Sequence, residues 1–399
     1  MTTVNSSLSD RDIEQLLRRG VAEIVIEEEM VNLLRSGRKL RLKEGLDPSA
    51  PDIHLGHMVM LRKMRQFQEL GHQVVLIVGD WTAQIGDPSG ASVTRPMLTA
   101  EQVKANAETY MKQFFKIVDK DRTEVRWQSE WFGKFDLSDV IRLTSKFTVA
   151  QFLARDDFNK RFNEQRPIAI TELLYPLMQA YDSVAIQSDV ECGGTDQKFN
   201  FLVGRELQSM MGQHSQQCFM TPMLVGTDGV KKMSKSLGNY IGIDEPPEDI
   251  YGKTMSISDD YILTYFELLT DVPEEELAEF RRQLGNDVFN PMTLKKRLAR
   301  ELVTQLYSDR DAAEAEQHFS KVVQHKELPD QIAEYAIDGD IAVSQLLAQS
   351  GLTGSRSEAV RLIKQGAVSI DGRKITDSFE AVTKGVIVKV GKRRFVRTT

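Results

Sequence analysis

The chain has 399 residues, which at roughly 150 residues per domain predicts two or three domains and excludes a single small module. Hydrophobic residues make up 41% and charged residues 27%, which is typical of a folded globular protein and excludes a disordered or fibrous one. The net charge of −7 is unevenly spread: residues 341–399 hold 11 Lys/Arg and 4 Asp/Glu, so this end is net +7 and the first 340 residues are net −14. Clustered basic residues favour a nucleic-acid partner, and a solvated basic surface is the alternative.

No apolar run approaches the roughly 18 residues of a membrane helix, and the N-terminal residues lack the basic start and apolar stretch of a signal peptide. We therefore expect a cytoplasmic protein with no membrane partner. The two cysteines, Cys192 and Cys218, are far apart in sequence, which argues against a disulfide framework and against a zinc site.

Apolar runs typical of strands alternate with helical periodicity through the first 225 or so residues. The expected strands are 40–46, 73–79, 124–128 and a stretch within 218–225, and the expected helices between them include 56–70 and 100–115. This alternation predicts a doubly wound, Rossmann-like parallel sheet.

From about residue 246 the strand pattern stops, and the expected helices follow Pro273 and the Asn290-Pro291 pair. Near the end of the chain, two short helices precede a hairpin whose turn is predicted at Asp371-Gly372. The predicted domains are a catalytic α/β domain with an N-terminal helix (1–245), an α-helical domain (246–328), a linker (329–340) and a small α+β domain (341–399).

The first predicted strand is followed by HLGH, which places His54 and His57 at its carboxyl end, where the next helix begins at Gly56. Ligands of open α/β sheets bind at that edge, and a helix N-terminus there suits a phosphate group. Gly56 lets a nucleotide approach the backbone closely. Taken alone, the two histidines are equally compatible with ordinary structural roles.

A second motif, KMSKS, places Lys232, Ser234 and Lys235 in a segment with the glycines typical of a loop. Two ammonium groups there suit the negative charge that grows on a departing polyphosphate. A solvated basic loop is the alternative, which the pairing with HLGH disfavours.

HLGH and KMSKS, in this order, resemble the two signatures of class I aminoacyl-tRNA synthetases. The segments GDWTAQIGDPSG (79–90), ITELLYPLMQAYD (170–182) and GGTDQKFN (193–200) are similar to those of bacterial tyrosyl-tRNA synthetases, and the likeness runs from about Leu40 to the C-terminus. The resemblance implies ATP-dependent activation of L-tyrosine and its transfer to tRNA(Tyr). It also implies ATP with Mg²⁺ as substrate, no permanently bound protein metal, and a homodimer.

The resemblance also assigns roles to residues. His54, His57, Lys232 and Lys235 would be catalytic through contacts to the ATP phosphates. Tyrosine would be bound by Asp87, Tyr175, Gln179, Asp182 and Gln197, and ATP by Asp47, Gly56, Arg95, Asp196, Ser234 and Lys235. Tyr175, Gln179 and Asp182 share one face of a predicted helix, with Asp182 accepting the phenol hydrogen bond and the other two joining Asp87 at the ammonium group.

Two positions, Lys43 and Ala91, differ from residues found in other members of the family that the chain resembles. Lys43 stands where that branch has a tyrosine that contacts the phenol, although a second bacterial branch resembles this chain there. Ala91 stands where relatives often have a basic residue, so Arg95 is expected to supply that charge alone.

The last 59 residues are similar to the S4 type of RNA-binding domain, through the segment SRSEAVRLIKQGAVSIDGRKI. RNA binding is expected from Arg356, Arg361, Lys364, Arg373 and Lys374, with more charge from Lys392, Arg393, Arg394 and Arg397. Such a surface suits phosphates and shape in structured RNA.

Three alternative functions remain open at this point. A tryptophanyl-tRNA synthetase shares the fold and both signatures, but the YxxxQxxD helix and the S4-like end favour tyrosine. A nucleotidyltransferase with HxGH is disfavoured by KMSKS, and a non-catalytic RNA-binding protein with a synthetase fold is disfavoured by the four intact signature residues.

Overall fold

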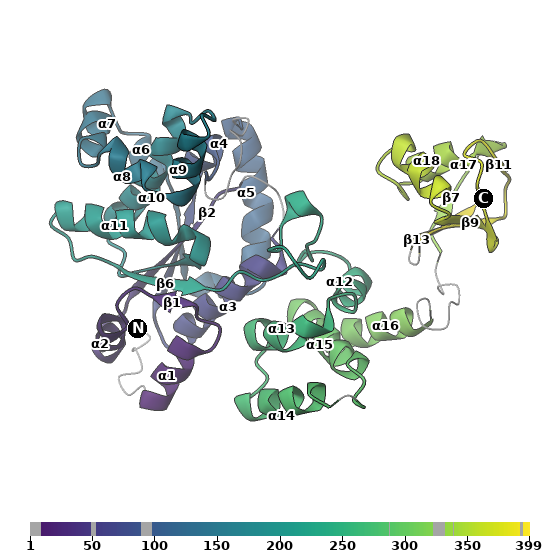
Figure 1. Ribbon diagram of the computed structural model, residues 1–399, viewed down its shortest axis with the longest axis horizontal. Helices are drawn as coiled ribbons and strands as arrows, with labels where there is room; N and C mark the ends of the chain where they lie inside the picture. Colours follow the sequence, from purple (N-terminus) through teal and green to yellow (C-terminus); the bar gives the residue numbers. More distant parts are fainter. Residues whose placement is uncertain are drawn as a thin grey trace. The chain divides into compact units, whose positions relative to one another are not determined.

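The structure is a computed structural model that describes residues 9–48, 53–88, 98–286, 288–321, 332–337, 339–391 and 394–399. It divides into two compact units, the first ending at Leu306 and the second beginning at Tyr307 (Figure 1). None of the helices in these ranges is long and apolar enough to cross a membrane.

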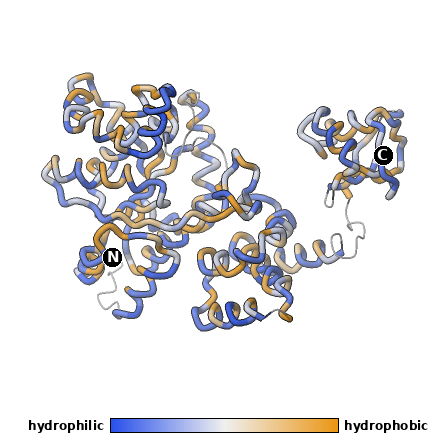
Figure 2. The backbone as a smooth tube through the Cα atoms, viewed as in Figure 1, coloured by the Kyte–Doolittle hydropathy of each residue, from blue (hydrophilic) through white to orange (hydrophobic). Residues whose placement is uncertain are grey.

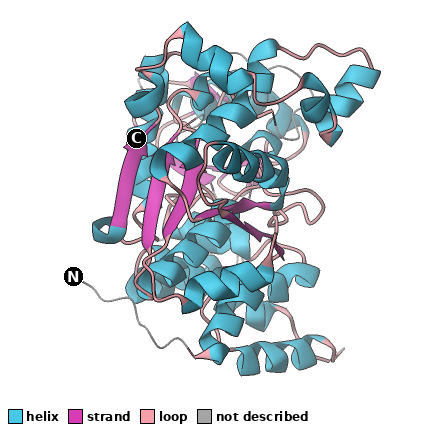
Figure 3. Ribbon diagram, turned by 90° about the vertical axis from the view of Figure 1, so that its left-hand side faces the viewer, coloured by secondary structure: helices cyan, strands magenta, loops and turns pink. Residues whose placement is uncertain are grey.

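The first unit is built on a six-stranded sheet in the order β1-β6-β5-β2-β3-β4. The strands are β1 (Glu23–Ile24), β2 (Arg41–Leu46), β3 (Gln73–Val78), β4 (Thr123–Trp127), β5 (Val190–Gly194) and β6 (Gln217–Thr221). All pairings are parallel except that of β1 with β6, and Figure 3 shows the strands running side by side between helices. The predicted doubly wound sheet is confirmed. Two strands were not predicted: β1, which has two residues, and β5, whose VECGG sequence contains a glutamate and two glycines.

Helices cover both faces of this sheet. On one face lies α3 (Leu55–Glu69), where Phe67 packs edge-on against Phe219 of β6 with ring centroids 5.4 Å apart. On the other face lie α10 (Ile170–Ile186) and α11 (Lys198–Met210); Ile186 packs with β3 and Phe201 with β6. In α11, buried residues such as Phe201 and Leu207 alternate with exposed residues such as Glu206 and Met210, as expected for a helix with one buried and one solvated side. Figure 2 shows hydrophobic and hydrophilic residues interspersed along the chain.

The remaining helices of the first unit surround this layered core. They are α1 (Asp10–Arg18), α2 (Glu27–Arg35), α4 (Thr82–Ile85), α5 (Ala100–Phe114), α6 (Ser129–Phe132), α7 (Leu137–Thr144), α8 (Val149–Leu153), α9 (Asp156–Asn163), α12 (Pro247–Thr254), α13 (Ile262–Leu269), α14 (Glu274–Leu284) and α15 (Met292–Leu306). Short 3-10 turns lie at Lys120–Arg122, Thr195–Gln197, Lys235–Leu237 and Asp259–Tyr261.

The helices after Pro246 pack against the sheet layers within the same unit. The guanidinium of Arg19 donates to the carbonyl oxygens of Thr270 and Val272 after α13, and Arg62 of α3 forms an ion pair with Asp271 at 2.5 Å. The division into compact units therefore falls after Leu306 rather than at the predicted limits near 245 and 328, and the predicted domain limits remain a proposal.

The second unit contains α16 (Asp309–Phe319) and a small α+β fold. Its five-stranded sheet has the order β10-β9-β12-β13-β7, and two further strands pair as β11-β8. The elements are β7 (Glu334–Tyr335), β8 (Ile341–Ala342), α17 (Val343–Gln349), α18 (Arg356–Lys364), β9 (Val368–Ile370), β10 (Arg373–Lys374), β11 (Ala381–Val382), β12 (Ile387–Val390) and β13 (Arg394–Thr398).

Part of the predicted linker belongs to this second fold. Strand β7 pairs with β13, and Ile337 is buried in the same apolar core as Val343 and Val388. The linker prediction relied on polar composition, which does not exclude a two-residue edge strand. The predicted hairpin turn is confirmed, because Asp371 and Gly372 both have positive φ angles, 46° and 82°.

Candidate active site

A pocket of about 340 Å³ lies where the carboxyl ends of β2 and β5 adjoin, the point at which the strand order changes direction. Ligands of open α/β sheets bind at such switch points. The predicted site residues in the pocket wall are Asp47, His54, Gly56, His57, Asp87, Tyr175, Gln179, Asp182, Asp196, Gln197, Lys232 and Ser234. Arg95 and Ala91 lie outside the described residues.

The two histidines lie at the start of α3, with ring centroids 3.9 Å apart. The Nδ1 atom of His54 accepts a hydrogen bond from the Gly56 N–H at 3.1 Å, and the Nδ1 atom of His57 accepts one from the His54 N–H at 3.3 Å. A Cβ at position 56 would lie 2.9 Å from the His54 ring, so glycine is required for the ring to fold over the helix end.

Both imidazoles are neutral at pH 7. Burial, followed by the neighbouring His57, lowers the pKa of His54 to about 2. Burial, followed by the nearby Lys235 ammonium, lowers the pKa of His57 to about 4. Because each Nδ1 atom already accepts a backbone N–H, each neutral ring carries its proton on Nε2 and can donate a hydrogen bond.

Asp182 is a buried carboxyl group in the pocket wall, with 2% of its surface exposed. One oxygen accepts from Gln128 Nε2 at 2.8 Å and the other from Trp131 Nε1 at 3.1 Å. Burial raises the pKa of Asp182 to about 7, against the opposing effect of the Lys43 ammonium. The two donors fix the orientation of this carboxyl group in the pocket wall.

Tyr175 contacts a neighbouring carboxylate in the pocket wall. Its hydroxyl donates to Asp47 Oδ2 at 2.7 Å, and Thr82 Oγ1 donates to the other Asp47 oxygen at 2.7 Å. A Cβ at Gly79 would lie 2.2 Å from Asp47, so glycine there makes room for this carboxylate. Tyr175 therefore links the residues expected to bind tyrosine with those expected to bind ATP.

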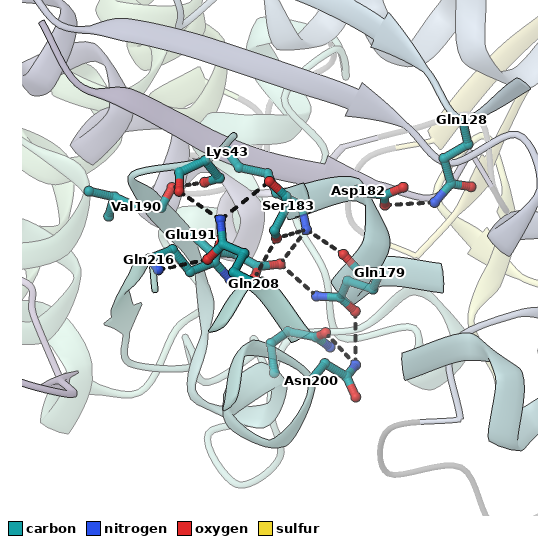
Figure 4. A network of polar contacts seen from close by, with 12 residues as sticks. Lys43, Gln128, Gln179, Asp182, Ser183, Val190, Glu191, Asn200, Gln208 and Gln216 are labelled. Carbon is teal, nitrogen blue, oxygen red and sulfur yellow. Dashed lines mark hydrogen bonds and ion pairs between the residues drawn. The ribbon is translucent and has the colours of Figure 1, made fainter. Parts of the chain in front are cut away.

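Gln179 and Asn200 connect two parts of the wall. Gln179 Nε2 donates to Glu191 Oε1 at 3.0 Å, and Gln179 Oε1 accepts from Asn200 Nδ2 at 2.9 Å (Figure 4). Asn200 Nδ2 also donates to Gln197 Oε1 at 3.1 Å, and Gln197 Nε2 donates to Asp87 Oδ2 at 2.7 Å. Asp87, which we expected at the tyrosine ammonium group, and Gln197, which we expected to bind tyrosine, are thus in direct contact.

Lys43 does not line the pocket. It is fully buried on β2, and its Nζ atom forms an ion pair with Glu191 Oε1 of β5 at 2.8 Å. The Lys43 ammonium group is therefore paired with a residue of the neighbouring strand β5.

Glu44, next to Lys43 on β2, contributes a second buried carboxyl group to the wall. Burial, followed by the Glu191 charge, raises the pKa of Glu44 well above its usual range. Within the described residues its Oε2 atom has no hydrogen-bond partner.

The loop that carries the second signature is held by Asn239, which is 4% exposed. Asn239 Oδ1 accepts from the Ser234 N–H at 2.8 Å, and its Nδ2 donates to Asp228 Oδ2 at 2.9 Å and to the Lys232 carbonyl at 3.1 Å. The base of the loop is tied to α13, because the Tyr265 hydroxyl donates to the Val225 carbonyl at 2.6 Å. The loop that the glycine content predicted is thus held in place by side-chain hydrogen bonds.

The two signature lysines lie near the two histidines. Lys232 Nζ forms an ion pair with Asp196 Oδ2 at 3.0 Å. Lys235 lies outside the pocket wall but close enough to lower the pKa of both His54 and His57. The arrangement brings two cations and two neutral N–H donors to one side of the pocket, which suits a polyphosphate.

Three residues in or near the pocket were missed by sequence reasoning; of these, Gln128 belongs to the pocket wall, whereas Glu191 and Asn239 support it from outside. Gln128 follows β4 directly, so the rule that ligands bind at the carboxyl ends of strands could have identified it. Glu191 lies on the unrecognised strand β5, and Asn239 lies just after KMSKS with no pattern that marks it. The structure describes no cluster of three or more His, Cys, Asp or Glu side chains suited to a metal ion within the ranges given above.

The expected RNA-binding side chains lie in the second unit. Arg356, Arg361 and Lys364 project from α18 and are exposed, as are Arg373 and Lys374 of β10. Arg356 Nε donates to Ser344 Oγ at 3.3 Å, and Arg373 forms an ion pair with Glu380. Arg361 and Lys364 lie on the last turn of α18, one helical turn apart. Of the four further basic residues near the C-terminus, Lys392 and Arg393 lie outside the described residues.

Comparison with known proteins identifies the family of the chain. The family described as tRNA synthetases class I (W and Y) matches residues 35–324, and the S4 domain matches residues 343–388. The chain is 65% identical over 389 residues to a tyrosine–tRNA ligase of Dehalococcoides mccartyi (strain CBDB1), covering 97% of this chain and 98% of that protein. It is 54% identical to a tyrosine–tRNA ligase of Moorella thermoacetica, covering 96% and 94%.

Among solved structures, the tyrosyl-tRNA synthetase of Archaeoglobus fulgidus complexed with L-tyrosine is 26% identical, with a TM-score of 0.62 over 77% of this chain and 99% of that chain. The curated relatives thus match nearly the whole chain in sequence, and the solved structure matches most of its fold. The chain belongs to the tryptophan and tyrosine family of class I tRNA synthetases and, within it, to the tyrosine–tRNA ligases.

Proposed function

We propose that this enzyme activates L-tyrosine with ATP and transfers the tyrosyl group to the 3′ end of tRNA(Tyr). The observation that carries the tyrosine specificity is the buried carboxyl group of Asp182, held by Gln128 and Trp131 in the same pocket as His54 and Lys232. A hydroxyl donor on the substrate satisfies this carboxylate. Phenylalanine would leave it without that partner, which is costly in a buried site.

In the first step, the tyrosine carboxylate attacks the α-phosphorus of ATP in line. The new O–P bond forms as the bond to the β-phosphate breaks, and pyrophosphate leaves. No protein nucleophile or general base is needed, because the attacking carboxylate is already ionised. Catalysis then rests on positioning and on charge stabilisation.

The roles at the phosphates follow from protonation. The Nε2–H groups of His54 and His57 donate to phosphate oxygens, and their low pKa values keep them neutral while they do so. Lys232 exchanges its Asp196 partner for the β- and γ-phosphates, joined by Lys235. Mg²⁺ arrives with ATP as part of the substrate and neutralises the same charge.

In the second step, a ribose hydroxyl of the terminal adenosine of the tRNA attacks the activated carbonyl carbon and releases AMP. The S4 domain contributes phosphate contacts through Arg361 and Lys364. Arg356, Arg373 and Lys374 remain part of the proposed RNA surface.

We also propose a cytoplasmic homodimer. Exposed apolar side chains gather on α7 to α10, helices that pack together in one cluster. These side chains are Leu137, Ile141, Val149, Phe162 and Ile170, each at least 59% exposed. Exposed apolar surface on a folded domain marks an interface with a partner.

ATP–pyrophosphate exchange with each of the twenty amino acids tests the proposed function. We expect exchange with tyrosine alone. Exchange with tryptophan would retain the fold and the phosphate chemistry but contradict the role of Asp182. Absence of exchange with every amino acid would favour a non-catalytic RNA-binding protein.

A further inference from the structure

A fully buried ion pair lies behind the pocket. The side chains of Lys43 and Glu191 are 0% and 1% exposed, and their charged atoms are 2.8 Å apart. Lys43 Nζ also donates to the Gln179 carbonyl at 2.6 Å and to Ser183 Oγ at 2.8 Å, so its three protons all have acceptors. Removing one member of such a pair leaves an uncompensated buried charge, so the pair is a rigid anchor.

Glu191 determines which way the Gln179 amide faces. Because Glu191 Oε1 can only accept, the Nε2 group of Gln179 must point toward it, as the 3.0 Å contact shows. The Oε1 atom of Gln179 then faces the opposite way, where it accepts from Asn200 (Figure 4).

Asn200 passes this orientation on to the pocket. It is fully buried, and its Oδ1 atom accepts from Arg155 Nη1 at 3.3 Å. Its Nδ2 group therefore faces both glutamine oxygens, that of Gln179 and that of Gln197. With Gln197 Oε1 engaged, Gln197 Nε2 faces Asp87, where it donates at 2.7 Å.

We propose that Asn200, anchored through Gln179 to the Lys43–Glu191 pair, is a positioning residue that aligns Gln197 and Asp87 for the α-ammonium and carboxylate groups of tyrosine. The inference rests on the proposed function, because it assigns those two residues to the amino acid. Asn200 is fully buried and does not line the pocket. It acts by fixing the orientation of two amides. Reversal of the Gln197 amide would turn its carbonyl oxygen toward the Asp87 carboxylate, and reversal of the Gln179 amide would turn its oxygen toward Glu191.

The variant Asn200→Asp tests this role with almost no change in shape. The introduced carboxylate can still accept a hydrogen bond from Arg155, so we expect the variant to fold. The carboxylate has no donor for the Gln179 and Gln197 oxygens. We expect the KM for tyrosine in ATP–pyrophosphate exchange to rise about tenfold or more, with the KM for ATP within twofold of the wild type. Asn200→Ala, which removes the donor without adding a charge, should raise the tyrosine KM less although it leaves a larger cavity.

A matched control separates positioning from stability. Gln68 is another buried amide, 1% exposed, whose Nε2 donates to the Asp119 and Arg122 carbonyls away from the pocket. Gln68→Glu loses donors in the same way, and it should change the melting temperature without changing the tyrosine KM.

Three results with the variants would overturn the positioning role of Asn200. An unchanged tyrosine KM in Asn200→Asp overturns the proposal. So does an equal rise in the tyrosine and ATP KM values, or a larger effect of alanine than of aspartate, because either indicates a purely structural role. Wild-type enzyme is assayed in parallel: if it shows no tyrosine-dependent exchange, the proposed function itself fails, and the positioning role fails with it.

Discussion

At the scale of single residues, the environment of Asp182 determines how the enzyme responds to pH. Burial raises its pKa to about 7, while Gln128 and Trp131 both donate to it. A phenol hydroxyl that also donates to this group stabilises the ionised form and lowers the pKa in the complex. Below the pKa of the free enzyme, tyrosine binding must therefore release a proton.

The first prediction concerns this linkage. The tyrosine affinity should fall by up to tenfold for each pH unit below about 7 and level off above it, because the protonated form must ionise before it accepts the phenol. Isothermal titration calorimetry from pH 5.5 to 8.5, in buffers of different ionisation enthalpy, measures both the affinity and the released proton.

Asp182→Asn is the control for this prediction. It should bind tyrosine more weakly, without the step near pH 7 and without proton release. A wild-type affinity that stays constant from pH 5.5 to 8.5 would show that Asp182 is already ionised throughout that range.

The same residue scale shows what the histidines contribute. Because the pKa values of His54 and His57 lie near 2 and 4, neither ring changes its charge between pH 6 and 8. Any pH dependence of tyrosine activation in that range must come from other groups, with Asp182 the foremost within the described pocket wall.

At the scale of elements, local signals were predictable and long-range pairings were not. His54, Gly56 and His57 lie within four consecutive positions after a recognisable strand, so the sequence alone placed them at the ligand-binding edge of the sheet. Tyr175, Gln179 and Asp182 follow helical spacing, and the structure brings all three to the pocket wall.

The partner of Lys43 could not be predicted in this way. Its ion pair joins β2 to β5 across 148 residues, and β5 was not recognised as a strand. The same limit applies to Tyr175, whose contact with Asp47 spans 128 residues. Such pairings depend on strand order and register, and a sequence pattern specifies neither.

The signature loop gives the prediction at this scale. Asn239→Ala removes the contacts that join Ser234, Asp228 and the Lys232 carbonyl, so the two signature lysines lose their fixed geometry. We expect the rate of tyrosyl-adenylate formation to fall about 10- to 100-fold with an unchanged tyrosine affinity, because the loop acts on the phosphates. Stopped-flow kinetics with pyrophosphate release measures the rate.

Asp228→Ala provides the graded comparison, since it removes only one of the Asn239 contacts along with its own bonds to the Val230 and Lys231 N–H groups. It should slow the same step less. If Asn239→Ala forms tyrosyl-adenylate at the wild-type rate, Asn239 does not position the loop. A loss of tyrosine affinity as large as the loss of rate would also contradict this role.

At the scale of the whole molecule, the proposed homodimer has a direct test. Phe162 on α9 is 60% exposed although it is a large aromatic residue. Phe162→Asp should produce a monomer in sedimentation velocity experiments, because a carboxylate cannot be buried in an apolar interface without a partner. Val288→Asp, at a 90% exposed apolar position elsewhere in the first unit, should leave the association state unchanged.

The last prediction separates the functions of the two units. Arg361→Glu and Lys364→Glu each reverse a charge on the last turn of α18. In a plot of log affinity for tRNA against log salt concentration, each variant should have a slope that is shallower by about 1. The KM for tRNA in aminoacylation should rise, whereas tyrosine-dependent pyrophosphate exchange should remain at the wild-type level, because the pocket lies entirely in the first unit. Lys384→Glu makes the same charge change in the second unit outside the proposed RNA surface and should weaken tRNA binding less. If all three variants weaken binding equally, the second unit attracts RNA through its net charge alone, and α18 has no special place in recognition.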